Sequence, residues 1–189
     1  MEDFVRNSFL PVIPLRGLVI FPLMNLHFDI GRAGSLAALK IAEKEGSKVL
    51  LLPQRDASEP NPGYEQLLSV GTVAEIRVVR KEDGNAITRV SARGLYRVEV
   101  HAFSEQGGAL FADVEPLPQT DISRNVFETY KSSILQAVND FAAVEPKLNK
   151  EVVKIISSLD DPDMFIDTVC GVLVRNEQDR QRLLELLRV

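Results

Sequence analysis

The chain has 189 residues, of which 45% are hydrophobic and 26% charged, and this balance is that of one or two compact domains rather than a disordered chain. The net charge of −5 argues against nucleic acid as a partner, because phosphate-binding proteins gather Lys and Arg. The single cysteine, Cys170, excludes an internal disulfide, so we expect a reducing, cytoplasmic compartment.

The beginning of the chain and its apolar runs indicate neither export nor a membrane anchor. Glu2 and Asp3 stand where a secretory signal carries basic residues. No apolar run approaches the ~20 residues that a membrane-spanning helix needs. We therefore expect no membrane partner.

Residues 1–117 are predicted to form a β-rich domain. Val70, Val73, Ile76 and Val78 stand among polar residues, and the Asp83-Gly84 pair after them favours a tight hairpin turn. The expected result is a curled, mostly antiparallel sheet with one or two helices packed on it. Further strands are predicted at residues 49–52, 86–92, 95–103 and 109–115, and one short helix at 35–45.

Residues 118–189 are predicted to form a helical bundle, which makes the whole chain α+β. Ten of the eleven glycines precede Leu117, and the proline-containing stretch 116–121 is the expected linker and hinge. Asn149, Asp161 and Asn176 are predicted to cap three helices at their N-termini. A longer helix is expected at 123–143, with one apolar face formed by Phe127, Tyr130, Ile134, Val138 and Phe141.

The sequence offers no recognisable catalytic, metal or cofactor site. His27, His101 and Cys170 lack the spacing of metal ligands. No phosphate-binding loop is present, and no serine stands in a G-x-S-x-G turn. We therefore predict that this chain has no catalytic residues and binds no metal or cofactor.

The opening of the chain resembles the N-terminal domain of bacterial ATP-dependent Lon proteases, in which a Leu-Pro-x-x-Pro-Leu-Arg segment leads through an apolar strand to a proline. Here it reads Leu10-Pro11-Val12-Ile13-Pro14-Leu15-Arg16-Gly17-Leu18-Val19-Ile20-Phe21-Pro22. The resemblance spans roughly residues 9–189. It continues at Gly31-Arg32, Val70-Gly71-Thr72, Gly94-Leu95-Tyr96-Arg97, Leu159-Asp160-Asp161-Pro162, Asp167-Thr168-Val169 and Asp179-Arg180-Gln181-Arg182, where the family usually has lysine in place of Arg180.

The resemblance implies a PUA-like β-domain at residues 1–117 and a helical subdomain at 118–189. It also implies a truncated piece of a homohexameric serine protease that degrades unfolded, damaged and regulatory proteins. The coiled-coil helix, the AAA+ module that uses ATP and Mg, and the Ser–Lys dyad would lie outside this sequence. We expect the chain alone to be a monomer or a weak dimer. A free-standing protein that uses this domain as a peptide or protein interaction module is the alternative.

The candidate substrate-binding residues are Phe21, Pro22, Leu23 and Met24. A protease that selects unfolded chains must recognise exposed apolar sequence, so its recognition domain should expose apolar surface of its own. Methionine adapts to many partners, and prolines tend toward the surface. The other interpretation is that these residues only close the β-core.

A second expected mode of binding is strand addition, in which an extended peptide pairs with an open sheet edge whatever its sequence. Arg77, Arg80 and Lys81 are interpreted instead as charges that protect such an edge from aggregation. RNA binding would follow only by analogy with other PUA-like folds.

Overall fold

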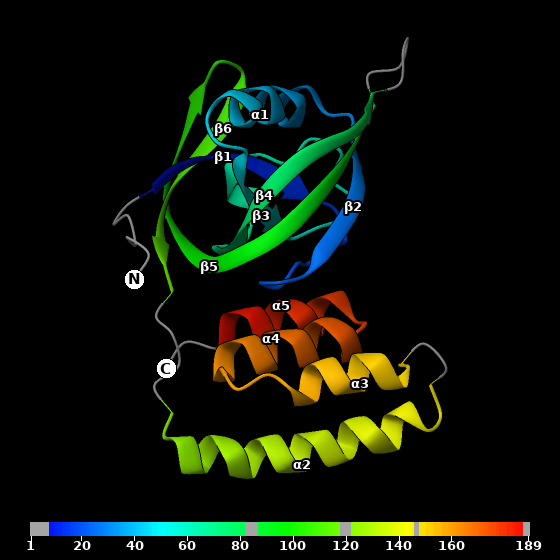
Figure 1. Cartoon of the computed structure of the whole chain (residues 1–189). Helices are drawn as coiled ribbons and strands as arrows, with labels where there is room; N and C mark the ends of the chain where they lie inside the picture. Colours follow the sequence, from blue (N-terminus) through cyan, green and yellow to red (C-terminus); the bar gives the residue numbers. More distant parts are fainter. Residues whose placement is uncertain (1–7, 82–86, 118–121, 146–147, 187–189) are drawn as a thin grey trace.

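The computed structural model describes residues 8–81, 87–117, 122–145 and 148–186. A mixed, mostly antiparallel six-stranded sheet curls around a core, α1 covers one end of it, and the four later helices lie together at the other end (Figure 1). The predicted α+β fold class is confirmed. The strands are β1 (Ser8–Leu15), β2 (Asn25–Ile30), β3 (Lys48–Pro53), β4 (Val70–Lys81), β5 (Thr88–Gln106) and β6 (Ala109–Pro116). The helices are α1 (Ala33–Lys44), α2 (Arg124–Ala142), α3 (Lys150–Ser157), α4 (Pro162–Leu173) and α5 (Glu177–Leu186), with a short 3-10 turn at Tyr64–Gln66.

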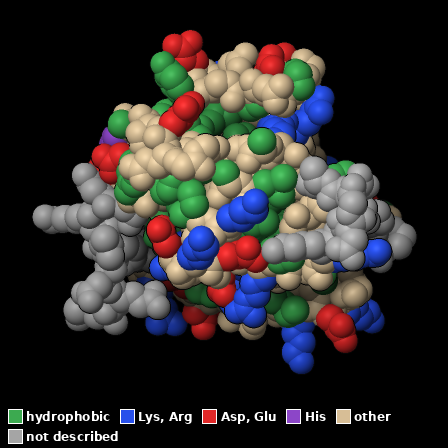
Figure 2. All heavy atoms as spheres, turned by 90° about the horizontal axis from the view of Figure 1, so that it is seen from above, with side chains coloured by type: hydrophobic (Ala, Val, Ile, Leu, Met, Phe, Trp, Pro, Cys, Tyr) green, Lys and Arg blue, Asp and Glu red, His purple; other side chains and the backbone are tan. Residues whose placement is uncertain are grey.

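The sheet closes on itself through its longest strand. Its order is β2-β5-β4-β3-β1-β6, and β5 pairs with β6 as well, so that β5, β4, β3, β1 and β6 form a barrel. Of the paired strands that the structure describes, only β1 and β3 are parallel. Among the described strands β2 pairs with β5 alone, which makes β2 the edge of the sheet. On the face seen from the α1 end, acidic and basic side chains are interspersed (Figure 2).

The two strands predicted at 86–92 and 95–103 are one strand, β5. The register with β4 shifts between Val73 and Ala74, where β5 contributes Leu95 as an extra residue. Such a bulge bends a strand without ending it. The prediction of two strands here is therefore wrong, because the chain continues as one strand through the bulge. The hairpin from β5 to β6 has Gly107 at φ 58° and Gly108 at φ 77°, as a two-residue turn of the primed type requires. The predicted turn at 83–84 lies outside the described residues.

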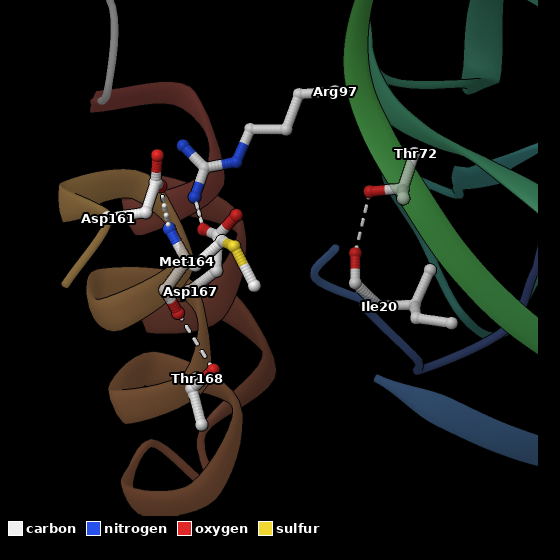
Figure 3. Close-up of polar contacts among 7 residues, drawn as sticks. All are labelled: Ile20, Thr72, Arg97, Asp161, Met164, Asp167 and Thr168. Atoms are coloured by element: carbon white, nitrogen blue, oxygen red, sulfur yellow. Dashed lines mark hydrogen bonds and ion pairs between the residues drawn. The ribbon is translucent and has the colours of Figure 1, made fainter. Parts of the chain in front are cut away.

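The apolar strand expected before Pro22 is not part of the sheet. Residues 18–21 run between β1 and β2 without strand pairing. The hydroxyl of Thr72 on β4 donates a hydrogen bond to the carbonyl of Ile20 at 2.7 Å (Figure 3). Val19, Ile20 and Phe21 are nevertheless buried, so their apolar run reflects burial rather than a strand.

The helical half follows the predicted caps. The side-chain oxygens of Asn149, Asp161 and Asn176 each accept a hydrogen bond from the backbone N–H three residues later, at 3.0, 2.8 and 3.1 Å. In α4, Pro162 follows the capping aspartate at the first helical position. These local predictions are confirmed because capping depends on residues close together in the sequence.

The predicted apolar face of α2 is only partly buried. Phe127 and Val138 face the core, whereas Tyr130 and Phe141 are 61% and 40% exposed. Lys131 is buried in their place, with its ammonium 5.6 Å from the ring centroid of Phe127. Since α2 packs on α3, only a narrow stripe of it is covered. None of the helices in the described part of the chain is long and apolar enough to cross a membrane.

The predicted linker falls mainly on residues that the structure does not describe. Leu117, at the end of β6, donates its N–H to the carbonyl of Arg97 at 3.0 Å. Residues 118–121 lie outside the described ranges. The hinge between the halves therefore stays a prediction.

Candidate functional site

The predicted substrate-binding segment lies at the junction of the β-domain and the helical half. Phe21 is 0% exposed and Pro22 is buried, while Leu23 and Met24 are half-buried. Phe21 and Pro22 therefore do not form an exposed apolar surface in this structure, and whether the four residues bind substrate stays a prediction. Phe21 packs in a cluster drawn from both halves, with Val19, Val70, Cys170 and Leu184.

Residues 21–24 form a tight turn that holds Leu23 in a left-handed backbone conformation. The carbonyl of Phe21 accepts a hydrogen bond from the Met24 N–H at 3.2 Å, and Leu23 has φ 65°. A turn with proline second and a positive φ third is of type II and normally has glycine at the third place. For leucine this conformation costs about 1–2 kcal/mol. The turn therefore presents a strained apolar residue.

The turn is fixed to β5 by a glycine. Gly94 accepts a hydrogen bond from the Leu23 N–H at 3.0 Å and donates its own N–H to the Met24 carbonyl at 2.9 Å. A Cβ at Gly94 would lie 2.3 Å from the carbonyl oxygen of Phe21. No other residue fits there without moving the turn.

The helical half approaches the same turn through a second glycine. A Cβ at Gly171 of α4 would lie 2.7 Å from the sulfur of Met24. The methionine side chain is flexible, so this contact is more easily adjusted than the one at Gly94. Met24 thus packs between the halves, and its exposure depends on where α4 lies.

A buried ion pair connects the two halves beside Phe21. Arg97 reaches from β5 to Asp167 on α4, and the two side chains are 9% and 5% exposed (Figure 3). Burial lowers the pKa of Arg97 to about 10, so it remains protonated at neutral pH and depends on the carboxylate of Asp167 as its counter-charge. Its guanidinium also lies 5.8 Å from the centroid of the Phe21 ring.

Arg180 on α5 provides a second polar link. Its Nη2 donates to the carbonyl of Gly171 at 2.6 Å, and its Nη1 donates to the carbonyl of Val19 at 3.4 Å. Its guanidinium lies 6.0 Å from the Phe21 ring centroid. In the next residue, the Gln181 amide donates to the carbonyl of Val70 at 3.2 Å. Helix α5 is therefore hydrogen-bonded to both halves.

No sequence pattern assigns a role to the charged residues of this junction. Arg97, Asp167 and Arg180 stand in segments that resemble the family, and nothing in their local sequence predicts burial. Each looks like a surface residue by type, since arginine and aspartate are rarely buried. The sequence offers an indirect indication of their importance, because the segments that resemble the family include these charged residues in both the β-domain and the helical half.

The junction holds one thiol and several buried charged groups. Burial raises the pKa of the Cys170 thiol, which keeps it protonated and a poor nucleophile at neutral pH. Within the described ranges no three His, Cys, Asp or Glu side chains gather as metal ligands would. Arg97 pairs with Asp167, and Arg180 donates to the carbonyls of Val19 and Gly171, while the Nε atoms of both arginines are buried without a hydrogen-bond partner among the described residues.

Comparison with known proteins agrees with the resemblance seen in the sequence. The family model described as the ATP-dependent protease La (LON) substrate-binding domain matches residues 9–189. The chain is 31% identical over 190 aligned positions to the Lon protease of Heliobacterium modesticaldum, covering 100% of this chain and 23% of that protein. It is 30% identical over 178 positions to the Lon protease of Escherichia coli K12, covering 94% and 22%.

Among solved structures, the N-terminal domain of Mycobacterium avium complex Lon protease has the same fold. The TM-score is 0.69 with 22% sequence identity, over 95% of this chain and 96% of that one. The chain spans less than a quarter of the length of the Lon proteases it matches. Because the family model covers residues 9–189, the chain belongs to the substrate-binding domain family of Lon proteases.

Proposed function

We propose that this chain is the substrate-recognition and assembly region of an ATP-dependent Lon serine protease, and that it binds unfolded polypeptide without catalysing a reaction. The match to the Lon substrate-binding domain over residues 9–189 carries the proposal. ATP, Mg and the Ser–Lys dyad would belong to other domains of a homohexameric protease.

Within this function, the turn at residues 21–24 is the proposed contact with substrate. Leu23 and Met24 are half-buried, so part of each side chain reaches the surface. The turn that contains the strained Leu23 makes two hydrogen bonds with Gly94, one from the Leu23 N–H and one to the Met24 carbonyl. Strained residues cluster at binding sites. For Phe21 to take part, the helical half would have to move away, because Phe21 packs against Cys170 and Leu184.

Binding to an unfolded protein tests the function directly. Reduced and carboxymethylated lysozyme serves as an unfolded ligand, native lysozyme as the folded control, and a single-stranded RNA as the third ligand. We expect the chain to bind the unfolded lysozyme alone, as measured by surface plasmon resonance. Equal binding of folded and unfolded lysozyme, or binding of RNA alone, would contradict the proposal.

Two replacements of Leu23 separate its contact with substrate from its backbone strain. Leu23→Ala and Leu23→Gly both remove the apolar side chain, so both should weaken binding of unfolded lysozyme severalfold. Glycine tolerates a positive φ, and we therefore expect Leu23→Gly to be more stable than Leu23→Ala by about 1 kcal/mol in urea unfolding. Unchanged affinity in both variants would remove Leu23 from the binding surface.

A further inference from the structure

A cavity of about 380 Å³ opens away from the junction, between the end of β1 and the second half of β2. Its volume lies within the range of about 300–1,000 Å³ that is usual for ligand sites. β1 pairs with β6 and then with β3, and β2 pairs with β5 alone among the described strands. No strand therefore bridges β1 and β2 across this opening.

The walls of the cavity combine apolar side chains with a strand edge. Ile13 and Ile30 are 1% and 2% exposed, Phe28 is 9% exposed, and Leu18 is partly buried beside them. Because Ile13 and Ile30 already lie almost wholly out of water, the apolar surface open to a ligand belongs to Leu18 and the exposed part of Phe28. An apolar side chain that covered this surface would leave water, which favours binding. The unpaired edge of β2 offers N–H and C=O groups to an extended peptide.

Two arginines stand at the mouth of the cavity. The Nη1 of Arg32 is buried and has no hydrogen-bond partner among the described atoms. Burial and the charge of Arg16 lower the pKa of Arg32, while the carboxylate of Glu59 acts in the opposite direction. Arg16 donates to the backbone carbonyls of residues 57 and 58, which are neutral acceptors. Asp56 also lies near Arg16, and hydrogen bonds from Ser58 together with the charge of Arg16 lower the pKa of its carboxyl group. The feature of the mouth that favours an anion is therefore the unpartnered Nη1 of Arg32.

The acid that lines the cavity is paired with an arginine outside it. Asp29 on β2 accepts hydrogen bonds from Nη1 of Arg89 on both of its carboxylate oxygens, at 3.0 Å each. Its charge is thus matched by Arg89 rather than by Arg16 or Arg32. An anion that reached Arg32 would supply an acceptor to a buried guanidinium nitrogen, which is a stabilising contact.

We propose that this cavity binds an extended segment of a polypeptide substrate that carries a carboxylate beside an apolar side chain. The apolar side chain occupies the space lined by Ile13, Phe28 and Ile30, and the carboxylate pairs with Arg32 and Arg16. The carboxylate is either the C-terminus of the substrate or an Asp or Glu side chain within it. The proposal rests on the substrate-binding function proposed above, and it adds a site that is separate from the turn at residues 21–24.

Three fluorescein-labelled ten-residue peptides test the site on the 189-residue chain. The first is apolar and ends in Val-Leu with a free carboxylate, the second is its C-terminal amide, and the third is an amide with Asp before Val-Leu. We expect the free acid to bind about tenfold more tightly than the amide in fluorescence anisotropy. If the third peptide binds tightly, the site also accepts side-chain carboxylates. If it binds weakly, the site accepts only the carboxylate of a C-terminus. Equal affinity of the three peptides would overturn the proposal.

Matched variants tie the preference to Arg32. Arg32→Gln should bind acid and amide peptides equally, whereas Arg80→Gln, which removes an exposed arginine of β4, should keep the preference. Equal loss in both variants would show a net-charge effect and overturn the site. If the wild-type chain bound unfolded lysozyme but bound the acid and amide peptides equally, this inference alone would fail. Loss of unfolded-protein binding altogether would instead remove the proposed function.

Discussion

The turn at residues 21–24 depends on the absence of one side chain. Gly94 lies so close to the backbone of Phe21 that a Cβ would meet the carbonyl oxygen at 2.3 Å and the Cα of Pro22 at 3.2 Å. Both neighbours are backbone atoms and cannot rotate away. The position of Leu23 and Met24 therefore follows from a glycine on another strand.

Replacing Gly94 by alanine should displace the turn and destabilise the fold. We expect the free energy of unfolding in urea to fall by about 1–3 kcal/mol, which is typical of overpacking. Gly34→Ala is the matched control, because a Cβ there would meet its nearest atom at 3.7 Å and the residue lies in α1. Alanine favours the helix, so this control should be neutral or slightly stabilising. Equal effects in the two variants would show that the contact at Gly94 relaxes freely.

At the scale of single elements, α4 brings three residues to the junction between the halves. It bears Asp167, Cys170 and Gly171, and its start is fixed by the Asp161 cap and Pro162. If the first turn of this helix frayed, the ion pair beside Phe21 would lose its support. Removing the cap should therefore weaken the junction without replacing any residue that packs in it.

The Asp161 cap gives a prediction with a conservative control. Asp161→Ala removes the acceptor for the Met164 N–H and should lower the free energy of unfolding by about 1 kcal/mol. Asp161→Asn keeps an acceptor oxygen and should stay close to wild type. Circular dichroism during thermal unfolding measures both. A loss in the asparagine variant as large as in the alanine variant would mean that charge, rather than the cap, matters.

Elements with local signals could be predicted from the sequence. The caps at Asn149 and Asp161 depend on neighbouring residues, and both predictions are confirmed. The burial of Phe21 depends on helices more than a hundred residues later, and no local pattern reports it. The pairing of Arg97 with Asp167 is of the same kind, so the geometry of the candidate site was missed although its segment was named.

For the whole molecule, the halves are joined by a core that is both apolar and charged. Val19, Phe21 and Val70 of the β-domain meet Cys170 and Leu184 of the helical half, and the Arg97–Asp167 pair lies beside them. Apolar contact stabilises the junction whatever its geometry, whereas a buried ion pair tolerates few arrangements. The ion pair therefore favours one relative position of the two halves while the junction is closed.

Breaking the ion pair on one side should destabilise the molecule more than replacing both partners. Asp167→Asn leaves the buried Arg97 without a counter-charge, and we expect the free energy of unfolding to fall by about 3–5 kcal/mol. The double variant Arg97→Met with Asp167→Leu should recover most of this loss, since apolar residues suit the site. Urea unfolding monitored by circular dichroism measures both. A harmless Asp167→Asn change would indicate that water reaches the pair.

Because Cys170 is buried in the junction, the rate at which its thiol is labelled can report how the junction opens. This cysteine is the only thiol of the chain, it is 6% exposed, and its raised pKa disfavours the reactive thiolate. Maleimide labelling of the native chain should therefore be limited by the rate at which the halves separate, and faster in Asp167→Asn. If substrate engages Phe21 and Pro22, adding unfolded lysozyme should accelerate labelling. The labelling rate of this single natural cysteine would then report how fast the two halves separate.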